Sequence, residues 1–328
     1  MKSTNLKKAE PKKRKSSWKK TAVKTAGLFL GLLILWFMVK DIIIHWEDIV
    51  PYLANMKFPL FLLSIMVYGV AFLFTGYNWS WLLWKMEKGP GRREYLDVHM
   101  VSALARYIPG GIWSIVGKAY LCNRKGVTAQ AATASIILEY VFQIISSSLF
   151  FVVLVPFLLQ GRENVWLIPV CFLAVVAALL VLPLCINWGI RLLSRILKKD
   201  CGDICLKKGF VYQALFRYAG AWLVTGAGLI VLVLAFSDIN AMEGIYLMLS
   251  YPVSWVVGFL SPSPNGMGIR EGILRILLGD RQAKELVLLI VVTTRIWTIL
   301  GEAAAFLGFK AYYLATGRKG KDVKISES

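Results

Sequence analysis

Six long apolar segments constrain this chain more than any other feature of its sequence. Each has the length of about 20 residues that a helix needs to cross the hydrocarbon core of a bilayer. The segments are 25–44, 58–84, 129–159, 166–188, 210–236 and 285–314. Hydrophobic residues make up 57% of the 328 residues and charged residues only 17%, whereas soluble domains hold about 25% charged residues. The sequence therefore predicts an all-α polytopic membrane protein. It excludes a soluble enzyme, a disulfide scaffold and a disordered basic chain.

Two further apolar segments are broken near their middles. Segment 95–118 is interrupted by Pro109-Gly110-Gly111, and segment 244–280 by the run from Ser261 to Gly268. If both crossed the membrane, most basic loops in the middle of the chain would face outward, against the positive-inside rule. If each returns to the side from which it enters, 28 Lys and Arg residues lie inside and five lie outside. We therefore expect six full spans, two re-entrant hairpins and both termini in the cytoplasm.

The regions that flank the membrane segments are basic and polar. Residues 1–24 hold ten Lys and Arg residues, and no small-residue cleavage site follows the next apolar run, which indicates an uncleaved signal anchor. We expect this arm to lie on anionic lipid, with nucleic acid the less favoured partner. A transmembrane domain is expected over 25–315 and a cytoplasmic tail over 316–328. The five cysteines and two histidines lack convincing metal-ligand spacing, so neither a metal nor another cofactor is expected.

The two breaks are alike in sequence. Pro109-Gly110-Gly111 in the first corresponds to Pro264-Asn265-Gly266 in the second when the segments are superposed. Hairpins that enter from opposite sides with such tips are typical of an inverted repeat, in which broken helices meet near the membrane midplane. Two proline-kinked helices without functional symmetry are the alternative interpretation.

Broken helices predict a site for an anion. A helix N-terminus presents free N–H groups and a partial positive charge, and half-helices are expected to begin near Ile112 and Ile269. Charged residues also lie beside the breaks or inside the spans, where each is costly in lipid. These are Arg106, Glu139, Arg270, Glu271, Arg295 and Glu302. A polar cavity that accepts an anionic head-group is the favoured interpretation, and buried ion pairs that set helix register are the alternative.

The residues around the breaks resemble those of a known family. Arg106-Tyr107-Ile108-Pro109-Gly110-Gly111-Ile112-Trp113, Gly117-Lys118 and Glu139 resemble the first signature of the lysylphosphatidylglycerol synthase transmembrane, or flippase-like, family. The run from Pro264 to Gly272 is similar to the second signature, which more often has Gly at the position of Asn265. The resemblance covers about residues 20–315 and implies a polytopic protein of the bacterial cell membrane. Because the last span ends near Leu314, we expect the membrane part without the cytosolic lysyltransferase domain of the full-length members.

These observations predict a lipid translocase that is not itself an enzyme. Its cargo is expected to be an anionic phospholipid or a polyprenyl-phosphate, held near the midplane while its chains stay in lipid. The expected head-group-binding residues are Arg106, Pro109, Gly110, Gly111, Trp113, Glu139, Pro264, Gly266, Gly268, Arg270, Glu271, Arg295 and Glu302. Two alternatives stay open: a phosphatidylglycerol lysyltransferase, as the family name implies, and a membrane partner of a separately encoded synthase or glycosyltransferase.

Overall fold

A computed structural model describes residues 43–107, 113–158, 207–263, 266–279 and 282–326, together with positions 36 and 40 and the residues 169–171, 173–175, 177, 181–186 and 188. Within these residues the ordered elements are all helices. They are α2 (Trp46–Ala54), α3 (Phe58–Met86), α4 (Arg92–Leu104), η1 (Ala105–Tyr107), α5 (Trp113–Arg124), α6 (Ala129–Leu158), α8 (Lys208–Leu234), α9 (Ala241–Leu260), α10 (Ile269–Leu278) and α11 (Lys284–Ser326).

Five of these helices are long and apolar enough to cross a membrane: α3, α6, α8, α9 and α11. Four of them coincide with the predicted spans 58–84, 129–159, 210–236 and 285–314. Most of the predicted span 25–44 and nine of the 23 residues of 166–188 lie outside the described residues, as does the basic arm 1–24. The all-helical, multi-pass class predicted from the sequence is therefore confirmed.

The fifth long helix, α9, differs from the sequence prediction. We expected the segment from 244 to 280 to enter the membrane and return to the same side, but its first arm is a helix of 20 residues. It begins at a capping box in which Asn240 and Glu243 satisfy each other's backbone N–H groups, and it continues through Pro252 to Leu260. This arm is therefore long enough to span a bilayer on its own.

Helix α3 lies at the centre of the packing and contacts four other helices, α4, α6, α8 and α11. Its Pro59 lies in the first turn, where a missing N–H breaks no helical hydrogen bond. A Cβ built at Gly69 would lie 3.1 Å from the carbonyl oxygen of Gly301, so α3 and α11 approach closely. Small residues permit such contacts between membrane helices. The crossing brings Tyr68 and Glu302 together.

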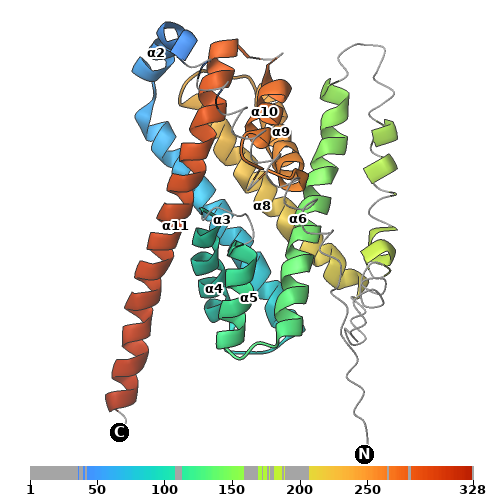
Figure 1. Ribbon diagram of the computed structural model, residues 1–328, viewed down its shortest axis with the longest axis vertical. Coiled ribbons are helices and arrows are strands. Elements are labelled where there is room, and N and C mark those ends of the chain that lie inside the picture. Colours follow the sequence, from blue (N-terminus) through green and yellow to red (C-terminus); the bar gives the residue numbers. More distant parts are fainter. Residues whose placement is uncertain are drawn as a thin grey trace, which may run out of the picture.

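The two broken segments both form helical hairpins. In the first, α4 and η1 lead to the break and α5 packs back against α4. In the second, α10 packs back against α9 after a bend at Ser261–Ser263 and two glycines with positive φ, Gly266 (66°) and Gly268 (80°). Figure 1 shows the α4–α5 hairpin in the lower half of the molecule and the α9–α10 hairpin in the upper half.

Basic loops gather at one end of the bundle. The C-termini of α3 and α5 and the N-termini of α4 and α6 all lie at the lower end in Figure 1. There the ammonium of Lys125 contacts Glu94, and Lys310 on α11 donates a hydrogen bond of 2.5 Å to Asp97. The loops 87–91 and 125–128 therefore share one side, as the charge distribution along the sequence predicts.

Candidate head-group site

The first hairpin ends in a partly buried ion pair with α11. Arg106 lies in the 3₁₀ turn η1, immediately before the break, and its Nη1 donates a 2.8 Å hydrogen bond to Oε1 of Glu302. The hydroxyl of Tyr68 on α3 lies 3.5 Å from the same carboxylate oxygen. Glu302 is only 4% exposed. A carboxylate so buried is costly unless it is paired, so α11 and the tip of the first hairpin hold each other in place.

The second hairpin makes a corresponding contact with α11 about two turns away. The carboxylate of Glu271, in the first turn of α10, contacts Nε of Arg295 and also accepts a 2.8 Å hydrogen bond from the backbone N–H of Gly268. Glu271 therefore closes the N-terminus of α10 and binds α11 at once. Arg295 and Glu302 are seven residues apart and lie on one face of α11. Each takes its partner from a different hairpin.

Arg270 lies between these two pairs. Its guanidinium is 4.5 Å from the centre of the Tyr251 ring and interacts electrostatically with Tyr68 and Glu302. Among the described residues, no carboxylate oxygen lies within 4 Å of it. A Cβ built at Gly258 on α9 would lie 2.9 Å from the Cβ of Arg270, so only glycine leaves room for this arginine.

We call these seven residues the central cluster: Tyr68, Arg106, Tyr251, Arg270, Glu271, Arg295 and Glu302. Its three arginines and two glutamates leave one positive charge in excess. Two buried polar atoms in it have no hydrogen-bond partner among the described residues, the hydroxyl of Tyr251 and Nη2 of Arg295. Buried donors without partners are uncommon in folded proteins. The cluster can therefore accept an additional anionic group rich in oxygen.

Glu139, which the sequence predicts in the head-group site, lies in a second buried network. Its Oε2 accepts a 2.7 Å hydrogen bond from Lys118, and its Oε1 lies 3.6 Å from Nδ1 of His99. Lys118 and His99 are 3.0 Å apart, and the ammonium of Lys118 lies over the Trp79 ring. We call Glu139, Lys118, His99 and Trp79 the hairpin anchor, because they join the α4–α5 hairpin to α6 and α3. Its charges are balanced within it.

The hairpin anchor lies near the central cluster, since Arg106 interacts electrostatically with both Lys118 and His99. His99 and Lys118 are not among the site residues predicted from the sequence. The sequence did hold a signal for His99, because it lies two helical turns before Arg106, on the same helix face, in a largely apolar segment. The role of His99 in the hairpin anchor depends on Glu139, which comes from α6.

Three of the remaining predicted site residues, Gly266, Gly268 and Trp113, belong to the described part of the chain. Gly266 and Gly268 have the positive φ values given above, which side chains rarely adopt. Trp113 begins α5 and is 45% exposed. Pro109, Gly110, Gly111 and Pro264 lie outside the described residues.

One surface group brings possible metal ligands together. Ligand atoms of His45, Asp48 and Glu285 lie within 4.8 Å of one another near the N-terminal ends of α2 and α11. All three side chains are partly or fully exposed, and exposed acidic groups often cluster without binding an ion. The group is far along α11 from Glu302 and takes no part in the central cluster.

Long apolar helices and two broken hairpins that meet charged residues on α11 define a multi-pass membrane protein. The chain belongs to the family described as the lysylphosphatidylglycerol synthase TM region, whose pattern it matches over residues 24–304. No curated protein matches the chain.

Proposed function

We propose that this protein is a lipid translocase of the bacterial cytoplasmic membrane, and that the central cluster binds the anionic head-group of its cargo. The observation that carries the proposal is the convergence of both hairpins on one face of α11. Arg106 and Arg270 come from the two different hairpins, and each interacts with Tyr68 and Glu302. Broken helices with charged residues at their tips are typical of transporter sites near the midplane.

The cluster's charge favours a phosphate as its guest. Keeping five charged residues inside a membrane domain costs free energy. A purely structural role would require balanced charges, but the central cluster has one positive charge in excess. A phosphate offers the planar guanidinium groups several oxygens and forms strong charge-assisted hydrogen bonds with them. In the proposed cycle the head-group competes with Glu302 for Arg106 and binds Arg270 at the same time. The exchange of partners loosens the hold of α11 on the first hairpin.

This exchange supplies a route between the leaflets. We propose that the α4–α5 and α9–α10 hairpins enter from opposite sides, with the basic loops in the cytoplasm. Loosening one hairpin at a time opens the cluster to one leaflet and then to the other, while the acyl chains remain in lipid. A lysylated phosphatidylglycerol fits this scheme, because its phosphate can bind Arg270 while its ammonium groups bind the released Glu302.

Lipid flipping in proteoliposomes tests the proposal. Purified protein is reconstituted with a fluorescent phosphatidylglycerol, and the accessible fraction is followed by chemical quenching from outside. Arg270→Gln and Arg106→Gln are each expected to slow flipping about tenfold or more, because a hydrogen bond to a charged group contributes about 1.5–3 kcal/mol. Lys88→Gln serves as the control, since Lys88 is an exposed basic residue away from the cluster. Wild-type flipping by both arginine variants would reject the site.

A further inference from the structure

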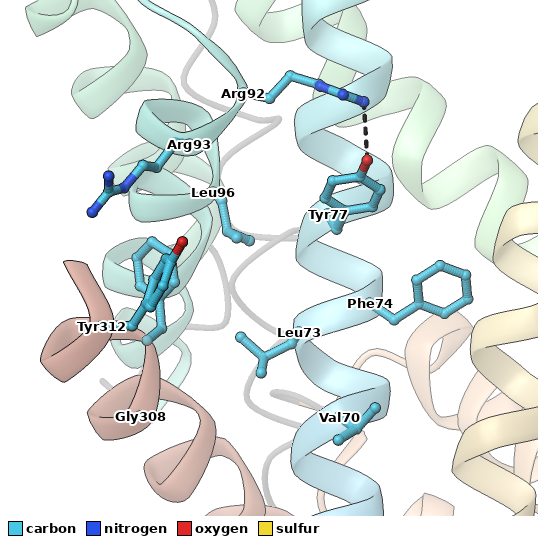
Figure 2. Close-up of a pocket in the computed structure, with 10 residues that line it drawn as sticks. Val70, Leu73, Phe74, Tyr77, Arg92, Arg93, Leu96, Gly308 and Tyr312 are labelled. Carbon is cyan, nitrogen blue, oxygen red and sulfur yellow. Dashed lines mark hydrogen bonds between the residues drawn. The ribbon is translucent and has the colours of Figure 1, made fainter. Parts of the chain in front are cut away.

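A groove on the side of the bundle lies outside the central cluster. It has a volume of about 730 Å³ and is lined by residues of α3, α4 and α11. Ligand sites in proteins have volumes of about 300–1,000 Å³. Figure 2 shows Arg92 of α4 reaching across to Tyr77 of α3, with Arg93 and Tyr312 on the opposite side. The groove is thus large enough for part of an amphipathic molecule.

The groove joins an apolar wall to a basic end. Val70, Leu73 and Phe74 on α3 and Leu96 on α4 form much of the wall. The basic end is formed by the first turn of α4, in Arg92 and Arg93. This division matches a lipid, because acyl chains favour the wall and an anionic phosphate favours the two guanidinium groups.

Both arginines are held at the mouth of the groove by aromatic residues. Arg92 donates a 3.1 Å hydrogen bond to the hydroxyl of Tyr77, and its guanidinium lies 5.3 Å from the centre of that ring. Arg93 donates a 2.9 Å hydrogen bond to the carbonyl oxygen of Tyr313 and lies 4.6 Å from its ring. Within the described part of the chain, no carboxylate oxygen lies within 4 Å of Arg92. Its charge is positioned without being neutralised by an acidic side chain there.

The groove leads toward the central cluster. On α11, Gly308 lines the groove six residues after Glu302, a distance of about 9 Å along the helix axis. On α3, Val70 lines it two residues after Tyr68. The groove is open to the surroundings of the bundle, since Val70 is 56% exposed and Tyr312 is 61% exposed. A lipid in the groove would therefore lie both in the membrane and next to the cluster.

We infer that this groove is a loading site for an anionic glycerophospholipid. Arg92 and Arg93 bind its phosphate at the basic end of the bundle, and an acyl chain lies between α3 and α11. From there the head-group has a short path along α11 to Arg106 and Glu302. Charge complementarity selects the occupant, because two arginines at the mouth favour an anionic lipid over a zwitterionic one. The transfer of the lipid to the central cluster rests on the proposed function, whereas the binding of the lipid in the groove does not.

Photolabelling in nanodiscs tests the binding. Phosphatidylglycerol with a photoreactive group in one acyl chain is added to a phosphatidylcholine bilayer, and labelled peptides are mapped by mass spectrometry. Labels are expected in residues 70–77 and 308–312. Photoreactive phosphatidylcholine at the same fraction is expected to label these peptides much less.

Two kinds of variant separate charge from shape. Arg92→Gln with Arg93→Gln is expected to reduce groove labelling about tenfold. The matched control is Lys88→Gln with Arg124→Gln, which removes two exposed charges at the same end of the bundle and leaves labelling unchanged. Gly308→Leu keeps both arginines and places a leucine side chain in the groove. A Cβ at this position meets nothing within 4 Å, so the substitution causes no clash in the bundle. It is expected to reduce labelling as well, without unfolding the protein.

Specific results would overturn the inference. These are equal groove labelling by both lipids, unchanged labelling in the double arginine variant, or cross-links between two copies of the chain through these peptides. Arg270→Gln distinguishes this inference from the proposed function, because it is expected to slow flipping and leave groove labelling intact. If the groove variants lose labelling but flip at the wild-type rate, the loading role fails and the proposed function stands. If the wild type labels in the groove but flips no lipid, the proposed function fails instead.

Discussion

The two hairpins look alike in sequence but are stabilised differently. The α4–α5 hairpin has arms of 13 and 12 residues and carries its own buried polar network, the hairpin anchor, against α3 and α6. The α9–α10 hairpin has arms of 20 and 10 residues and depends on tight glycine packing at its tip. The comparison shows that the resemblance between the two segments lies in their tips and charges. The lengths of the arms differ between the two hairpins, because each hairpin packs against different helices.

Substitution of Glu271 is expected to destabilise the second hairpin more than any other change considered below. Glu271→Gln removes the charge that pairs with Arg295 and leaves this partly buried arginine without its carboxylate partner. A loss of about 3–5 kcal/mol in the free energy of unfolding is expected. Thermal unfolding in detergent measures it. Glu271→Leu combined with Arg295→Leu should recover much of the loss, and failure to recover any would show that the ion pair is not the source.

The hairpin anchor tests the first hairpin in the same way. Lys118→Met removes the ammonium that donates to Glu139, but His99 stays 3.6 Å from that carboxylate. We expect a loss of about 2–3 kcal/mol, smaller than for Glu271→Gln because a partner remains. The same unfolding measurement applies. Lys118→Met combined with His99→Leu should cost clearly more than the sum of the two single variants, and strict additivity would contradict the shared network.

Glycine substitutions sharpen the comparison of the two hairpins. Gly258→Ala places a Cβ 2.9 Å from the Cβ of Arg270 and is expected to cost about 1–3 kcal/mol through overpacking. Gly117→Ala in α5 meets only side-chain atoms at 3.9 Å or more. It is expected to be neutral or to stabilise the helix by up to about 1 kcal/mol. Equal effects in unfolding experiments would show that the two hairpins are equally tight.

The smallest expected effect lies at the basic end, in Glu94. Burial alone would raise the pKa of Glu94, but hydrogen bonds from Lys125 and Tyr313 outweigh it and lower the pKa. A carboxyl whose pKa is lowered on folding stabilises the fold above its unfolded pKa of about 4.3, and this contribution is lost as the pH falls through the folded pKa. The effect should stay within about 1 kcal/mol, as for other partly exposed pairs. Glu94→Gln should flatten the dependence of unfolding temperature on acid pH, and an unchanged profile would exclude Glu94 as its source.

The membrane class and the positions of the breaks could be predicted from the sequence. Apolar length and charge are properties of each segment by itself, so four predicted spans return as long helices and both broken segments as hairpins. Arg106, Arg270, Glu271, Arg295 and Glu302 could likewise be chosen, because a charge in an apolar segment is costly wherever its partner lies. Those five residues meet in the structure.

Only the tertiary structure decided which charges meet. Arg106 and Glu302 are 196 residues apart, and the register between two helices leaves no trace in the periodicity of either one. For the same reason Glu139 lies with Lys118 and His99, and the first arm of the predicted re-entrant segment 244–280 is a helix of 20 residues. The groove between α3, α4 and α11 is also a product of helix crossing. Hydropathy along the chain determines what enters the membrane, whereas side-chain packing between helices determines what the membrane domain can bind.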